Sequence, residues 1–156
     1  IELLSTNPVC PGKYIVIFGG DVASVDESLK EELEAGSDLV INSLFIPNLH
    51  EDVLSSIAGT TEVKKFGAIA IIESFSVASC VIGADRAAKA ASIKLVEMRL
   101  ANGLGGKGYF VMTGALEDIQ ASVDAAKEYI KNEGLLAGCE IIARPHQELI
   151  EKGVYW

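Results

Sequence analysis

The chain contains two related copies of one sequence pattern, and the first copy lacks the opening part of the second. Three segments of the first copy, residues 1–4, 12–17 and 46–50, are matched in order by residues 93–96, 106–111 and 142–146. The two histidines of the chain, His50 and His146, therefore occupy the same place in each copy. A repeat of this length indicates a duplicated domain, because the repeating units of solenoid proteins are only ~20–50 residues long.

The second copy is complete and predicts the order strand, helix, strand, strand, helix, strand. We expect strands at 67–73, 93–100, 109–113 and 140–143, helices at 77–91 and 116–132, a glycine-rich loop at 101–107 and a short helix at 146–152. Apolar residues recur at helical spacing from Leu116 to Ile130, and Gly134 follows as a helix C-cap. This βαββαβ order is the ferredoxin-like arrangement, and right-handed crossovers place both helices on one face of an antiparallel sheet.

The first copy predicts only part of that arrangement. We expect strands at 3–4, 14–18 and 39–46, a loop at 5–12 and a helix at 22–35. Nothing corresponds to the 26 residues 67–92, so we expect that a segment of about this length precedes Ile1 in the natural protein. The predicted fold class is α+β, with tandem ferredoxin-like domains of which the first lacks its opening strand and helix. The predicted limits are 1–54 for the first domain, 55–66 for a linker and 67–156 for the second domain with its C-terminal tail.

Composition and charge exclude two classes of partner. The 22 acidic residues outweigh 13 basic ones and give a net charge of −9, so nucleic acid is not an expected partner, because binding its phosphates needs a basic patch. Although 49% of the residues are hydrophobic, no apolar run reaches the ~18 residues that span a membrane. The acidic residues concentrate at 26–34 and 117–133, which is typical of solvated helix faces.

The three cysteines are widely spaced and odd in number, which argues against a disulfide framework and favours a reducing compartment. Cys80 and Cys139 fall in a helix and at a strand start, where cysteine is usually a small core hydrophobe. Cys10 lies between Pro8 and Pro11 in a predicted loop. An inert exposed thiol, a redox thiol and a metal ligand all remain open for it, and a metal site would need further ligands from symmetry-related copies.

The second loop, Asn102–Gly108, contains a match to the G-x-G-x-x-G pattern. A strand follows it rather than a helix, so no helix N-terminus faces a phosphate, and we interpret the glycines as turn residues. His50 and His146 each follow the last predicted strand of their copy, and a turn or interface position explains them better than a shared ligand role. No acid–base pair, catalytic triad or phosphate loop is present, so an enzyme is not predicted.

Several motifs together resemble the bacterial microcompartment shell domain. They are Gly67–Glu73, Ala84–Ala91 with its Asp-Arg-Ala-Ala-Lys core, Gly106-Lys107 before a strand, and Arg144-Pro145-His146. The tandem copies, with Cys10-Pro11-Gly12-Lys13 in the first, are similar to the tandem-domain shell proteins. The resemblance implies a structural protein in the microcompartment shell of a bacterial cytoplasm.

The resemblance also implies an assembly and a site. In that family three two-domain chains form a pseudo-hexameric homotrimer, and the loops between the second and third strands line its central pore. The implied pore-lining residues are Asn7, Pro8, Val9, Pro11 and Gly12 in the first copy and Asn102, Gly103, Leu104, Gly105 and Gly106 in the second. Three copies of Cys10 would meet there. The resemblance implies that they hold an iron–sulfur cluster, as in family members that have this cysteine. One [4Fe–4S] cluster per trimer is therefore implied, with three Cys10 ligands and a function in electron transfer.

Edge-to-edge contacts with other shell proteins are implied for Lys89, Arg144, Pro145 and His146. In the first copy the matching turn reads Asn48-Leu49-His50, which lacks the arginine. An encapsulated or cytosolic redox protein is a further implied partner. Two alternatives stay open, a cluster-free metabolite pore and a trimeric ligand-binding sensor of ferredoxin-like fold.

Overall fold

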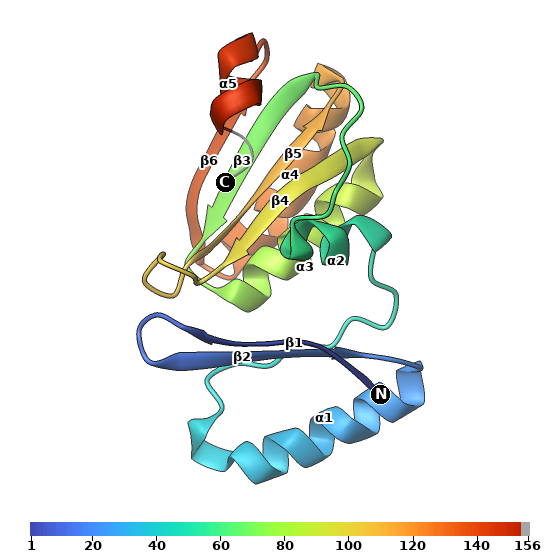
Figure 1. The fold of residues 1–156 in the computed structure, drawn as a ribbon, viewed down its shortest axis with the longest axis vertical. Helices are drawn as coiled ribbons and strands as arrows, with labels where there is room; N and C mark the ends of the chain where they lie inside the picture. Colours follow the sequence, from blue (N-terminus) through green and yellow to red (C-terminus); the bar gives the residue numbers. More distant parts are fainter. Residues whose placement is uncertain (154–156) are drawn as a thin grey trace. The chain divides into compact units, whose positions relative to one another are not determined.

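The structure, a computed structural model, describes residues 1–153 and divides into two compact units, Ile1–Asn48 and the remainder from Leu49 onward. Figure 1 shows the elements of each. The first unit contains β1 (Glu2–Val9), β2 (Lys13–Gly19), α1 (Val22–Gly36) and the 3-10 turn η1 (Ser37–Leu39). The second contains α2 (Glu51–Ala58), β3 (Ala68–Ser74), α3 (Val77–Ala90), β4 (Ile93–Leu100), β5 (Gly108–Gly114), α4 (Leu116–Asn132), β6 (Leu136–Ile142) and α5 (Gln147–Gly153).

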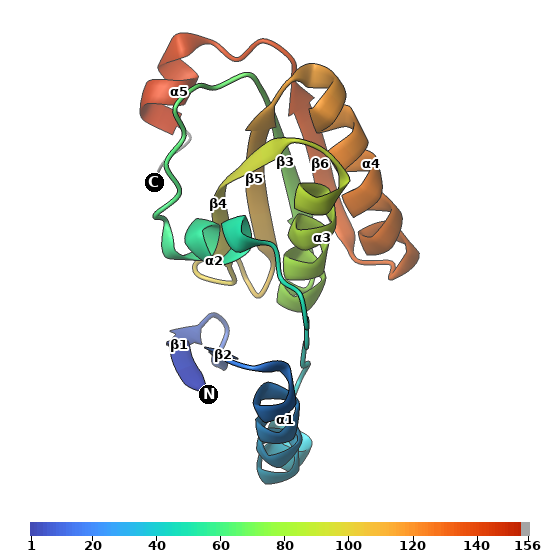
Figure 2. The same ribbon diagram turned by 90° about the vertical axis from the view of Figure 1, so that its right-hand side faces the viewer.

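The second unit confirms the predicted βαββαβ domain. Its sheet has the strand order β4-β5-β3-β6, and each neighbouring pair is antiparallel. Helices α3 and α4 pack together on one face of this sheet (Figure 2). The end of α4 also follows the prediction, because Gly134 adopts a φ of 70° directly after the helix.

Both faces of this sheet are covered, but unequally. The larger apolar cluster lies under the helices, and its fully buried members include Phe110, Met112, Leu95 and Ile130. A smaller cluster of Ile69, Val96 and Val111 occupies the other face, where side chains of the segment before β3 and of α5 pack against it. The helix-covered face therefore supplies most of the hydrophobic stabilisation of the unit.

The first unit is a hairpin followed by one helix. Strands β1 and β2 pair antiparallel from Glu2↔Gly19 to Val9↔Lys13. Helix α1 begins after Asp21, whose carboxylate accepts a hydrogen bond from Ser24 N at 3.0 Å, and it carries no buried residue. This order matches β4, β5 and α4 of the second unit, as the repeat predicts.

Two predictions for the first copy are wrong. The strand expected at 39–46 does not form, and Leu39 and Ile41 are 88% and 71% exposed. In the second unit the matching strand, β6, pairs with β3, whereas no strand within residues 1–153 pairs with residues 39–46. The predicted loop 5–12 is also too long, because β1 continues to Val9.

The linker predicted at 55–66 is partly helical, because α2 extends into it. Val53 of α2 is fully buried in the larger apolar cluster of the second unit. Asp52 of the same helix is buried and accepts a hydrogen bond from Lys94 Nζ at 2.5 Å. The second unit therefore begins at Leu49, whereas the sequence predicted that the first domain extends to residue 54. The tail residues 154–156 of the predicted second domain lie outside the described residues.

A Val53→Ala variant is expected to lower the free energy of unfolding by about 2 kcal/mol, because two methyl groups leave a fully buried site. The neighbouring Leu54 is 39% exposed, so Leu54→Ala serves as the matched control and should cost less than about 1 kcal/mol. Denaturant unfolding of both variants would measure the difference. Equal effects would mean that α2 is not part of the second unit's core.

Candidate functional site

Cys10 lies at the tip of a tight hairpin. The pair Val9↔Lys13 closes the hairpin, so that only Cys10, Pro11 and Gly12 form the turn. Gly12 has a φ of 65°, which favours glycine. The Cys10 thiol is free and exposed, and it is therefore accessible to further copies of the chain.

Three of the predicted pore-lining residues belong to strand β1 rather than to a loop. Asn7 and Pro8 pair with Ile15 and Tyr14, and Val9 closes the ladder. Asn7 and Pro8 are exposed, and Val9 is half-buried. Their backbone is held by the hairpin, so the position of the turn with Cys10 is fixed by strand pairing instead of by proline stiffness alone.

The second candidate loop joins β4 to β5 and is closed by a hydrogen bond from Ala101 N to Lys107 O at 2.9 Å. Gly103, Gly105 and Gly106 all have positive φ values, between 63° and 92°. A Cβ atom at Gly103 or Gly105 would meet no heavy atom within 4 Å, so backbone conformation and not space selects glycine there. Of the other predicted members, Asn102 is exposed and Leu104 half-buried.

Lys107, at the end of this loop, is fixed by an ion pair. Its Nζ lies 2.6 Å from Oε1 of Glu73 on β3. Both side chains are about one-third exposed, at 37% and 31%. The only lysine of the second loop is therefore paired with a carboxylate.

A polar pair that the sequence interpretation missed precedes each loop. In β4, Arg99 Nε donates to Glu97 Oε1 at 2.5 Å, and in β1 Asn7 Nδ2 donates to Ser5 Oγ at 2.6 Å. Each strand has an irregular register just before its acceptor, between Leu95 and Glu97 and between Leu3 and Ser5. The sequence does carry a signal for this pair, because polar residues stand two positions apart at matching places in both copies.

The Glu97 carboxylate is buried, with its side chain 8% exposed. Its Oε2 is the one buried side-chain oxygen or nitrogen within residues 1–153 that has no hydrogen-bond partner. Burial, and after it the charge of Glu97, raise the pKa of the nearby Tyr109 hydroxyl, so that this phenol stays protonated at neutral pH.

An Arg99→Ala variant is expected to destabilise the fold by about 2 kcal/mol, because it leaves the buried carboxylate unpaired. This value is below the usual cost of breaking a buried pair, since Arg99 is one-third exposed. The double variant Glu97→Ser/Arg99→Asn copies the first-copy pair and should recover most of the loss. Thermal unfolding would test this, and a double variant as unstable as Arg99→Ala would argue against the pairing.

The other two cysteines are less exposed than Cys10. Cys80 is fully buried, and burial raises the pKa of its thiol. Cys139 is half-buried, and burial is also the main cause that raises its pKa. Both thiols therefore stay protonated, which agrees with their predicted role as small hydrophobes. Within residues 1–153 no group of three or more His, Cys, Asp or Glu side chains could hold a metal ion in one chain.

Both histidines cap short helices. His50 Nδ1 accepts a hydrogen bond from Asp52 N at 3.2 Å at the start of α2, and His146 Nδ1 accepts one from Glu148 N at 3.3 Å at the start of α5. The equivalent positions thus have the same local role in both copies, which supports the turn interpretation. α2 and α5 are equivalent helices of the repeat.

The predicted edge residues lie on two elements of the second unit. Lys89, in the last turn of α3, is 40% exposed at its side chain and lies 2.6 Å from Asp85 Oδ2. The other oxygen of Asp85 accepts a hydrogen bond from His50 N at 2.8 Å. Arg144 and His146 are exposed in the turn after β6, and Pro145 is half-buried. In the matching turn of the first copy, Leu49 instead packs against the core of the second unit.

Comparison with known proteins gives three agreeing results. The model of the BMC domain matches residues 1–49 and 68–145. The bacterial microcompartment shell protein PduT of Citrobacter freundii is 38% identical over 149 residues, which cover 96% of this chain and 81% of that protein. A crystal structure of a microcompartment protein from Desulfitobacterium hafniense superposes with a TM-score of 0.91 at 38% identity, and the match covers 96% of this chain and 83% of the other.

Proposed function

Because the chain belongs to the family of bacterial microcompartment shell proteins with BMC domains, we propose that three copies form a pseudo-hexameric tile whose central pore holds an iron–sulfur cluster. The function of the chain in the shell is structural, as it is for its relatives. None of the helices among residues 1–153 is long and apolar enough to cross a membrane.

The repeat itself supports a trimer. In the second unit, α2 packs on β4, and Val53 and Leu95 are fully buried in the same cluster. In the repeat, α5 corresponds to α2 and β1 corresponds to β4, so Leu149 matches Val53 and Leu3 matches Leu95. Leu149 is 36% exposed and Leu3 is 62% exposed. A second copy that places its α5 against β1 of the first would bury both, and each chain has one surface of either kind.

Such a contact is heterologous, because it joins different surfaces of the two chains, and it must close into a ring to avoid an open filament. Two domains in each of three chains give six sectors. This is the number that the BMC-domain family resemblance implies for one tile.

The donor set fits a cluster shared by three chains. A [4Fe–4S] cluster is usually held by four thiolates, and three symmetric Cys10 thiolates would leave one iron available to a water or a small ligand. One chain alone cannot supply the set, since no group of three or more His, Cys, Asp or Glu side chains within residues 1–153 could hold a metal ion. The exposed position of Cys10 at a hairpin tip is the observation that carries this proposal. When bound, the cluster would supply one-electron transfer at the pore.

The protein's own residues would position and shield that site. Pairing of β1 with β2 fixes the turn that bears the thiol. The second-copy loops, with glycine at 103, 105 and 106, would present no side chain at these positions beside the cluster. Lys107 would stay outside this arrangement because Glu73 already neutralises it.

Anaerobic purification tests the proposal against a metabolite pore without a cluster. We expect a broad absorption band near ~400 nm and about four irons per three chains. A colourless, iron-free trimer would favour the metabolite pore, in which Cys10 is only a lining thiol.

A further inference from the structure

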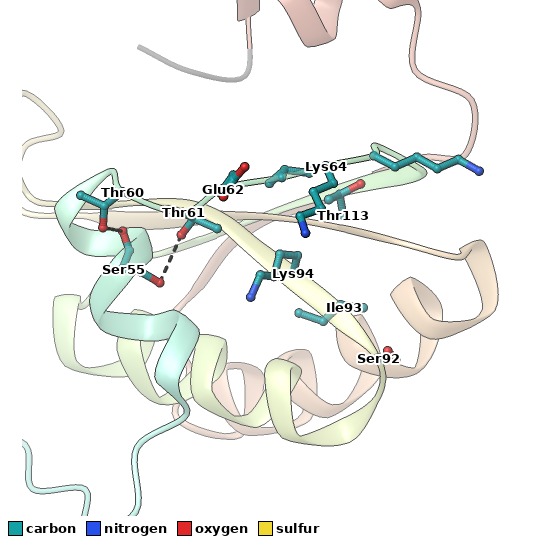
Figure 3. Close-up of a pocket in the computed structure, with 11 residues that line it drawn as sticks. Ser55, Thr60, Thr61, Glu62, Lys64, Ser92, Ile93, Lys94 and Thr113 are labelled. Carbon is teal, nitrogen blue, oxygen red and sulfur yellow. Dashed lines mark hydrogen bonds between the residues drawn. The ribbon is translucent and has the colours of Figure 1, made fainter.

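The second unit has a cavity that the proposed function does not use. It has a volume of about 710 Å³ and lies between the end of α2, the segment 60–65 and the start of β4 (Figure 3). This is within the range of ~300–1,000 Å³ that small-molecule sites occupy. Its lining residues are Ser55, Thr60, Thr61, Glu62, Val63, Lys64, Lys65, Ser92, Ile93, Lys94 and Thr113. We call this cavity the lysine pocket.

The lysine pocket is positive in a strongly negative chain. Three lysines line it, and Glu62 is the only carboxylate among its lining residues, whereas the chain as a whole has a net charge of −9. Lys94 is paired with Asp52, but neither Lys64 nor Lys65 forms an ion pair with any carboxylate of residues 1–153. Figure 3 shows Lys64 and Lys94 reaching the cavity from the segment 60–65 and from β4 respectively.

The segment 60–65 also has backbone N–H groups that are not paired within the protein. In the part of the chain that the structure describes, the backbone N–H groups of residues 61–65 have no hydrogen-bond acceptor. The hydroxyl protons of Thr60 and Thr61 are already donated to Ser55 O and Ser55 Oγ, both at 3.3 Å. The backbone carbonyls of residues 61–65 likewise have no donor within residues 1–153, so it is the ammonium groups of the lysines that favour an anionic ligand.

The pocket is held in place at both ends of its lysine-bearing segment. At one end, Thr60 N donates to Ser55 O at 2.9 Å, which fixes the segment to α2. At the other end, the Thr113 hydroxyl accepts from Gly67 N at 3.0 Å and donates to Ala68 O at 2.9 Å. The segment therefore crosses the cavity with its ends tied to a helix and to β5.

We propose that the lysine pocket binds the phosphate group of a small phosphorylated molecule. A phosphate group carries about −1.5 to −2 charges and three acceptor oxygens at neutral pH, which matches several lysine ammonium groups around one space. Lysine binds phosphate as a point charge and needs no planar fork geometry. Val63 and Ile93 provide the apolar contact for the organic part of the ligand.

Titration of the ¹⁵N-labelled protein with inorganic pyrophosphate, followed by amide chemical shifts, tests this proposal. We expect saturable shifts at residues 60–65 and 92–94. The Lys64→Gln/Lys65→Gln variant should weaken binding at least about tenfold, because two charge-assisted contacts are lost. Lys94 is left in place, since its removal would leave Asp52 buried and unpaired.

The matched control is Lys131→Gln/Lys152→Gln, which removes the same charge from exposed positions of the same unit. Its affinity should stay within about twofold of the wild type. Equal weakening by both double variants, or shifts spread over other surfaces, would overturn the proposal. Equally tight binding of sulfate at the same ionic strength would contradict its assignment to phosphate. None of these results depends on the pore or its cluster.

Discussion

A Leu149→Asp variant is expected to sediment as a single 16.5 kDa chain under conditions in which the wild type sediments as a trimer. Leu149 of α5 occupies the repeat position of Val53, which is fully buried on the second unit. If α5 buries Leu149 on β1 of the next chain, aspartate would place an unpaired carboxylate in that contact at all three interfaces. Burying an unpaired charge costs several kcal/mol, which is enough to dissociate the ring at micromolar concentration.

Leu116→Asp is the matched control for this variant. Leu116 is exposed to a similar extent, 41% against 36%, and it begins helix α4 of the same unit. The control should remain a trimer in analytical ultracentrifugation. A trimeric Leu149→Asp protein, or equal dissociation of both variants, would argue against the α5 contact.

The second large effect is expected for Cys10→Ala. Each chain contributes one exposed thiol, so a single substitution removes three ligands of the proposed cluster at once. We expect complete loss of iron and of the visible absorption, while the trimer persists because Cys10 lies on an exposed hairpin turn. Iron analysis together with sedimentation would measure both properties.

Cys139→Ala is the matched control for Cys10→Ala, because it also removes one thiol from each chain. Cys139 is half-buried in β6 and its raised pKa keeps it protonated, so its removal should leave the iron content unchanged. Iron retained by Cys10→Ala at the wild-type level would show that the metal is held elsewhere. Iron lost by both variants would point to a general effect on folding.

Most of the second domain could be predicted from the sequence, because its signals are local. Helix α4 begins and ends at the predicted residues 116 and 132, and β4 spans the predicted 93–100. The apolar spacing and Gly134 define these limits without reference to the rest of the chain. The repeat also predicted that the two histidines occupy equivalent turn or interface positions, and in the structure each of them caps a short helix.

The errors in the first copy have a different cause. A strand forms only where another strand pairs with it, and residues 39–46 have an apolar strand-like sequence but pair with no strand within residues 1–153. The reverse holds for Asn7 and Pro8, which look like loop residues but pair with β2. Propensity describes the segment alone, whereas pairing depends on residues far away in the sequence.

The polar composition of the predicted linker gave no indication that its first part is helical. Ser55 and Thr60 suggest a polar connection, but Val53 supplies the apolar contact that holds α2 on the second unit. The Glu97–Arg99 pair was missed for a related reason, because a charged residue in a strand is ordinarily read as solvent-facing. Only its burial in the folded sheet reveals the role of the carboxylate.

Native mass spectrometry of the anaerobically purified wild type tests the central claim most directly, because one mass reports both the assembly and its cofactor. The account predicts a principal species of three 16.5 kDa chains plus one cluster of four irons and four sulfides. A species of three chains without added mass would contradict the cluster. A single chain would contradict the tile itself.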